Sequence, residues 1–291
     1  MINTRRAILA ALSATLLVLS GCSSLDTLNG VNSVSPGDSG TTKVAAGIAF
    51  GPDPRQKLDI YAPANARNAP VIVFFYGGSW ANGRRQDYGF AAKALAARGF
   101  VVVVPDYRLV PQVRFPTFVE DGASAVAWAS ANIAQYGGNP TKIGVSGHSA
   151  GAHIAMLLTM DQHWLAAAGA PGAIKAAVGL AGPYDFAPFA PGGAAEAALG
   201  NATDVRSTQP ISFARADAPP VLLLAGDEDT TVFPRNSTAM AAALTAKNAS
   251  ADVKIYPGIG HIGIILALSK PFRGKAPALD DTVVFFHRQL G

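Results

Sequence analysis

Short, dense apolar runs alternate with longer stretches of helical periodicity from about residue 43 onward. The runs are too continuous for strands that expose one face to water, so they predict strands buried on both faces, as in a parallel sheet. The expected strands are an early one at 56–61, followed by 71–76, 101–104, 142–146, 176–180, 221–225 and 253–256.

Helical patterns lie between most of these strands. The alternation of strand and helix predicts an α/β fold: a doubly wound, mostly parallel sheet with helices on both faces. Residues 183–218 are rich in Pro, Ala and Gly and show little periodicity, which predicts a loop or a small lid insertion. The expected helices are 89–98, 118–132, 150–160, 234–247 and 282–290.

The composition is that of a folded globular protein. Of the 291 residues, 49% are hydrophobic and 14% are charged, which excludes a disordered or highly charged chain. This length suits one α/β domain with a full core. The net charge is +4, but no run of Lys or Arg exceeds two residues, so we expect no nucleic-acid partner.

The N-terminus has the pattern of an export signal. Arg5 and Arg6 precede an uncharged, mostly apolar stretch of 13 residues over 7–19. That stretch is too short to cross a bilayer as a helix, which takes roughly 20 residues, and it suits a secretory signal. Residues 19–22, Leu-Ser-Gly-Cys, resemble a bacterial lipoprotein cleavage box, and the resemblance implies that Cys22 becomes the first mature residue and carries a lipid. The alternative is an ordinary signal with a chance cysteine.

The segment that follows Cys22 is polar and holds few bulky side chains, which predicts a flexible tether. The expected organisation is a signal peptide over 1–21, a lipidated tether over 22–42 and one domain over 43–291. We therefore expect an exported protein, lipid-anchored to a membrane of the bacterial cell envelope. Cys22 is the only cysteine, so no intramolecular disulfide is expected.

The sharpest chemical signal is the sequence Gly-His-Ser-Ala-Gly at 147–151. It follows a predicted strand and opens a predicted helix, which is the context that a nucleophile elbow requires. The two glycines leave room for the sharp turn, and the turn strains Ser149 so that its hydroxyl stands clear of the sheet. The alternative is a chance match in a chain rich in Gly and Ala.

A serine nucleophile needs a base in contact, and the chain has five histidines. His261 is the expected base, because it lies in a Gly-rich loop after the last strand. His148 and His153 lie on the elbow and its helix, where local packing is expected. His163 follows Asp161 and hints at a metal, but two ligands are not a site, so no metal site is expected. The remaining one, His287, is expected to be exposed on the terminal helix.

Three acids, Asp227, Glu228 and Asp229, follow the strand at 221–225, and each is a candidate partner for the base; acids here also serve to shape turns. The candidate oxyanion hole is the segment Phe-Tyr-Gly-Gly-Ser-Trp at 75–80, whose paired glycines let the backbone approach a substrate. A plain turn is the alternative for this segment. The expected surroundings of the oxyanion are Gly77, Gly78, Ser79 and the N–H of Ala150.

Residues 55–290 resemble the α/β-hydrolase superfamily, and within it the carboxylesterases related to hormone-sensitive lipase and the arylformamidases. The resemblance rests on Tyr-Gly-Gly-Ser-Trp at 76–80, Pro-Asp-Tyr-Arg-Leu at 105–109, the elbow at 147–151, and the segments 226–232 and 260–261. It implies that Asp229, three residues before Val232, is the acid. The chain order Ser149, Asp229, His261 also matches the superfamily.

One position departs from the family pattern. Tyr76 stands where the family usually has a histidine before the two glycines, and we expect it to replace that histidine as a hydrogen-bonding brace of the oxyanion loop.

The resemblance implies a serine esterase that hydrolyses short-chain carboxylic esters through an acyl-enzyme, without a metal or cofactor. The expected partners are a small-molecule ester and a membrane held through Cys22. Two alternatives remain open: an arylformamidase or other amide or peptide hydrolase on the same fold, and a non-catalytic surface binding protein. The expected pocket walls are Trp80, Tyr107, Tyr184 and Phe186.

Overall fold

The computed structural model describes residue 30 and residues 38–291, so the predicted signal peptide and Cys22 lie outside the described residues. A sheet of eight strands in the order β1-β2-β4-β3-β5-β6-β7-β8 forms the centre. The strands are β1 Thr41–Ala49, β2 Lys57–Pro63, β3 Ala69–Phe75, β4 Val101–Pro105, β5 Gly138–His148, β6 Ile174–Leu180, β7 Val221–Gly226 and β8 Ala251–Tyr256.

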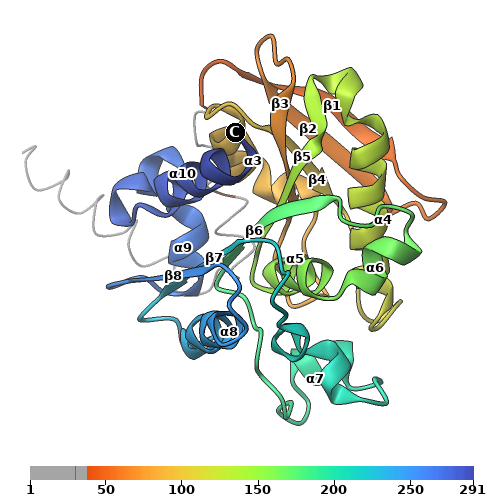
Figure 1. Ribbon diagram of the computed structural model, residues 1–291, viewed down its shortest axis with the longest axis vertical. Helices are drawn as coiled ribbons and strands as arrows, with labels where there is room; N and C mark the ends of the chain where they lie inside the picture. The colour runs from red at the N-terminus through yellow and green to blue at the C-terminus, as the bar shows by residue number, and fades with distance from the viewer. Residues whose placement is uncertain (1–29, 31–37) are drawn as a thin grey trace, which may run out of the picture.

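Helices cover both faces of this sheet. Figure 1 shows α3 and α10 together on one side, and α4, α5 and α6 on the other. The helices are α3 Gly89–Ala96, α4 Thr117–Asn132, α5 Ala150–Met160, α6 Gln162–Ala167, α7 Ala194–Leu199, α8 Arg235–Thr245, α9 His261–Leu266 and α10 Ala278–Leu290. Short 3-10 helices occupy Arg85–Tyr88, Ile133–Tyr136, Val205–Thr208, Pro210–Phe213 and Lys270–Lys275.

The predicted doubly wound, mostly parallel α/β sheet is confirmed. Strands β4, β3, β5, β6, β7 and β8 run parallel, and their inner members are buried on both faces. Only the edge formed by β1 and β2 is antiparallel. Strand β1 was not expected, because its residues are largely exposed and form no dense apolar run. Its pairing with β2 is also irregular.

Two segments that were expected to be loops contain helical turns. His261 is the first residue of α9 rather than part of a Gly-rich loop, with Gly260 just before the helix. The segment 183–218 holds α7 and two 3-10 helices, of which the first follows Asp204. Their sequences are too short for a helical period to be read.

Strand β5 fixes the position of the site, and its neighbour α10 packs directly on it. Gly144 in β5 faces this helix, because a Cβ added there would lie 2.5 Å from Cε1 of Phe286 and 3.2 Å from Cδ1 of Leu290. The absence of a side chain at residue 144 therefore lets α10 approach the sheet.

Replacing Gly144 by Ala is expected to lower the free energy of unfolding by about 1–3 kcal/mol, since overpacking pushes α10 outward. Urea denaturation of the purified domain measures this value. Gly274→Ala is the matched control, because nothing lies within 4 Å of its added Cβ. Equal stability of the two variants would contradict the close packing.

Candidate active site

Ser149 lies in the sharp turn between the end of β5 and the start of α5. Its backbone has φ 55° and ψ −124°, a conformation that residues other than glycine rarely adopt and that stores strain. The flanking glycines make the turn sterically feasible. A Cβ on Gly147 would lie 2.4 Å from the backbone carbon of Gly151, and one on Gly151 would lie 2.2 Å from the carbonyl oxygen of Phe75. The turn therefore has the geometry that the motif predicts.

The structure brings Ser149, His261 and Asp229 together. Nε2 of His261 lies 2.9 Å from the Ser149 hydroxyl oxygen, and Nδ1 lies 2.7 Å from Oδ2 of Asp229. Since a carboxylate only accepts hydrogen bonds, Nδ1 carries a proton and donates a hydrogen bond to Asp229. This leaves Nε2 to accept a hydrogen bond from the serine hydroxyl. This orientation is the one that a general base for Ser149 needs.

Asp229 is buried and is held by the backbone that follows it. Its Oδ1 accepts hydrogen bonds from the N–H groups of Thr231 and Val232, at 2.9 and 2.8 Å. The two competing acids do not reach His261. Asp227 is exposed and accepts a hydrogen bond from the N–H of Gly258, and Glu228 is also exposed.

The loops that carry the acid and the base touch each other at Gly226. A Cβ there would lie 1.8 Å from the carbonyl oxygen of Ile259, a contact that only glycine permits. The same carbonyl accepts the N–H of Glu228 at 3.2 Å. Asp229 and His261 are thus fixed relative to each other by backbone contacts as well as by their own hydrogen bond.

The loop after β3, the candidate oxyanion loop, has an unusual backbone conformation. Gly78, Ser79 and Trp80 all have positive φ, and the carbonyl of Gly78 accepts the N–H groups of residues 81 and 82. Ser79 and Ala150 line the same pocket as Ser149. Gly77 packs behind them, where an added Cβ would lie 3.0 Å from the Cβ of Ser149.

Tyr76 supports this loop through Arg55, a residue that no sequence pattern singled out. Nη2 of Arg55 donates to the Tyr76 hydroxyl at 2.9 Å and also donates to the carbonyl of Gly83. Burial raises the pKa of the Tyr76 hydroxyl, so it stays protonated. The ring of Tyr107 stacks on Tyr76 at 4.5 Å, and its hydroxyl donates to the Tyr76 carbonyl.

A cavity of about 220 Å³ opens beside Ser149, and two of the four expected wall residues line it. Trp80 and Phe186 lie in its wall with stacked rings at 6.2 Å. Tyr107 and Tyr184 do not line it, because both are fully buried in the core, which corrects the expectation for them. The other lining residues are Ser79, Ala150, Pro183, Ala194, Ala195, Thr231, Val232, Phe233, Arg235 and Asn236.

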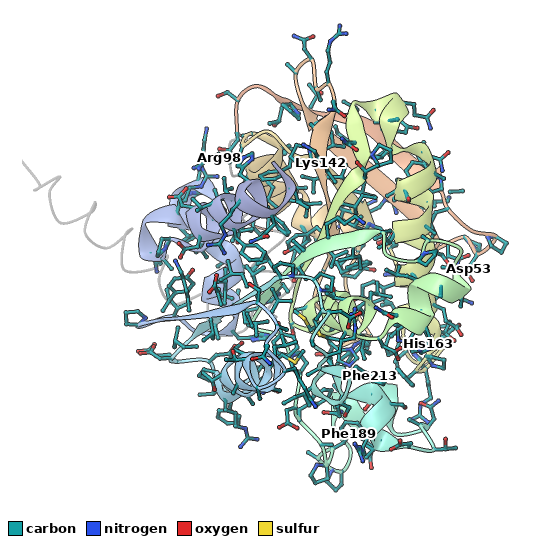
Figure 2. All side chains as sticks on the ribbon, in the orientation of Figure 1. Asp53, Arg98, Lys142, His163, Phe189 and Phe213 are labelled. Carbon is teal, nitrogen blue, oxygen red and sulfur yellow. The ribbon has the colours of Figure 1, made fainter. Side chains whose placement is uncertain are left out.

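His163 and His287 take no part in the cluster of Ser149, His261 and Asp229. His163 is near the outer edge of the molecule, where its Nδ1 pairs with Asp161 at 2.7 Å (Figure 2). His287 is exposed, and its ring stacks on Phe100.

Within residue 30 and residues 38–291, no group of three His, Cys, Asp or Glu side chains is placed to hold a metal ion. Among the helices described, none is long and apolar enough to cross a membrane.

Residues 58–244 match the model of the BD-FAE family. Esterase LipC of Mycobacterium tuberculosis is 31% identical over 235 residues, which cover 74% of this chain and 58% of the relative. The isoprenylcysteine alpha-carbonyl methylesterase of Arabidopsis thaliana is 29% identical over 282 residues, covering 85% of this chain and 63% of the relative. The chain therefore spans about three fifths of the length of these curated relatives.

Solved structures share the fold. A truncated carbohydrate esterase from gut microbiota superimposes with a TM-score of 0.75 at 21% identity, covering 88% of this chain and 99% of that chain. A thermophilic carboxylesterase cloned from a metagenomic library gives a TM-score of 0.78 at 19% identity, covering 92% and 95%. The sheet and its helices are thus arranged as in these proteins.

His153 gives the structure a pH-dependent stability. It is fully buried against Trp80, and its Nε2 donates to the carbonyl of Thr208 at 2.8 Å. Burial lowers its pKa from 6.5 to about 4. Between these pH values His153 binds a proton in the unfolded chain but not in the folded chain. The free energy of unfolding therefore falls as the pH falls.

Lowering the pH from 6.5 to 4 is expected to reduce the free energy of unfolding by about 3 kcal/mol through His153. His153→Gln keeps a donor for the Thr208 carbonyl but does not titrate, so its stability should fall less over the same range. Urea denaturation at a series of pH values measures both slopes. Parallel slopes for the two proteins would contradict the assignment.

Proposed function

The chain belongs to the BD-FAE family of α/β-hydrolase carboxylesterases, and from this we propose that it hydrolyses carboxylic esters through Ser149, His261 and Asp229. The observation that carries the proposal is the continuous chain of hydrogen bonds from Asp229 through His261 to the serine hydroxyl. Relatives that are named as esterases support the same reaction class.

In the first half of the proposed reaction, the Ser149 hydroxyl attacks the ester carbonyl while Nε2 of His261 takes its proton. Asp229 stabilises the imidazolium that forms. The negative charge on the carbonyl oxygen is met by backbone N–H groups. That of Ala150, the first residue of α5, has no partner within its own helix, and the helix dipole adds to its effect.

The second half of the reaction releases the acyl group. His261 gives its proton to the departing alcohol oxygen, which leaves the acyl group on Ser149 as an ester. A water molecule then attacks this ester as His261 accepts one of its protons. The carboxylic acid leaves, and the serine regains its proton, so the enzyme returns to its starting state.

The size of the cavity supports a preference for short acyl or alcohol groups. Its volume of about 220 Å³ is below the range of roughly 300–1,000 Å³ typical of drug-sized ligands. The walls at Trp80, Phe186 and Phe233 are apolar and aromatic, which suits an uncharged group. We therefore propose short-chain carboxylic esters as substrates.

Ser149→Ala is expected to lower kcat on p-nitrophenyl acetate by at least about 10⁴-fold, because no other group can form the acyl-enzyme. The wild-type domain should show a burst of p-nitrophenol and should be labelled by a fluorophosphonate at Ser149. Activity should also fall along a series of acyl esters beyond butyrate. A Ser149→Ala variant with full activity would overturn the proposal.

We also propose that the exported chain carries its lipid on Cys22, as the cleavage-box sequence at 19–22 suggests. The full chain expressed in a bacterium should incorporate labelled palmitate and sediment with membranes. Cys22→Ser should lose both properties, because serine offers no thiol for the lipid. Equal palmitate labelling of the two proteins would contradict the proposal.

A further inference from the structure

His148, the residue before the nucleophile, is buried between two polar partners. Its Nε2 lies 3.0 Å from the backbone carbonyl oxygen of His261, and its Nδ1 lies 2.9 Å from the hydroxyl of Tyr88. The two imidazole rings of His148 and His261 are 4.9 Å apart. The sequence led us to expect local packing for His148, but packing alone does not account for a ring whose two nitrogens each have a hydrogen-bond partner.

The partners assign the proton positions on His148. A carbonyl oxygen only accepts, so Nε2 must carry the proton that faces His261. Burial and the neighbouring His261 lower the pKa of His148 well below 6.5, so the ring is neutral and has only one proton. Nδ1 is therefore an acceptor, and the Tyr88 hydroxyl donates to it.

Tyr88 itself is firmly placed, so it can hold the orientation of the histidine. It ends the 3-10 helix Arg85–Tyr88 and is buried among the rings of Phe74, Tyr76 and Phe90. Burial raises the pKa of its hydroxyl, which keeps it protonated as a donor. The Tyr88–His148 pair thus presents one fixed N–H to the backbone of residue 261.

This contact reaches the backbone of His261 itself, in addition to the contacts of its loop at Gly226 and its hydrogen bond to Asp229. His261 begins the short helix α9 directly after a loop in which Gly258 has a positive φ. The ring of His261 is oriented by Asp229, but its backbone carbonyl is held by His148. Since His148 ends β5 next to Ser149, one strand end sets the position of both the nucleophile and the base.

We propose that His148 is a positioning residue for the reaction: with its proton fixed by Tyr88, it holds the backbone of His261 so that Nε2 of the base stays within reach of Ser149. This inference rests on the proposed function. It predicts that loss of the His148 N–H lowers kcat while KM changes little, because the contact places the base and does not line the pocket.

The test compares His148→Met with His148→Gln, two side chains of similar size of which only glutamine offers an N–H at the reach of Nε2. We expect His148→Met to lower kcat on p-nitrophenyl acetate by about tenfold, with KM within about twofold. His148→Gln should recover most of that loss. His163→Gln, an exposed histidine outside the site, is the matched control and should leave both constants unchanged.

Equal kcat values for His148→Met and His148→Gln would overturn the inference, since packing would then explain any loss. So would a His148→Met variant that keeps wild-type kcat. Thermal unfolding of each variant shows whether it is folded at the assay temperature.

Tyr88→Phe is a second variant that removes a single oxygen and leaves the ring packing in place. It should lower kcat in the same direction, because His148 is then free to move its proton to Nδ1. In the double variant with His148→Met, the two losses should not add, since both break the same chain. Fully additive losses would overturn the inference.

Failure of the inference can be told from failure of the proposed function. If the wild-type protein hydrolyses esters and Ser149→Ala does not, the proposed function stands whatever the His148 variants do. If the wild-type protein shows neither ester hydrolysis nor fluorophosphonate labelling, both fall together.

Discussion

The backbone turn at Ser149 is the constraint on which the rest of the site depends. The chain passes from β5 into α5 within one residue, and the approach to the carbonyl of Phe75 leaves no space for a Cβ on Gly151. The strain in this turn is balanced by a buried strand on one side and an entirely buried helix on the other. A looser scaffold would let the turn relax and would move the Ser149 hydroxyl away from His261.

The other parts of the site are fixed to this turn by backbone contacts. The loops of Asp229 and His261 meet at Gly226, and Tyr76 and Arg55 support the candidate oxyanion loop. His148 links His261 back to β5. Backbone contacts of this kind hold polar groups in fixed positions, which is the preorganisation that an oxyanion site requires.

The sequence predicted the elements that are governed by burial. Strands β3 to β7 lie inside the sheet, and their dense apolar runs could be recognised without any partner. Strand β1 could not, because it pairs with β2 at an exposed edge and none of its residues is fully buried. The meeting of Ser149 and His261 could be anticipated from strand ends, but the two partners of His148 depend on tertiary packing. The burial of Tyr107 and Tyr184 in the core also depends on tertiary packing.

Asp229 accepts hydrogen bonds from the backbone N–H groups of residues 231 and 232, which every residue except proline can provide. The side chains of this segment instead form part of the outer rim of the cavity, where Phe233 is 51% exposed. The side chains of this segment thus shape the rim of the cavity, while its backbone holds Asp229. A change of side chain at residues 231–233 that keeps these N–H groups can therefore alter the rim of the cavity without removing the hydrogen bonds that hold Asp229.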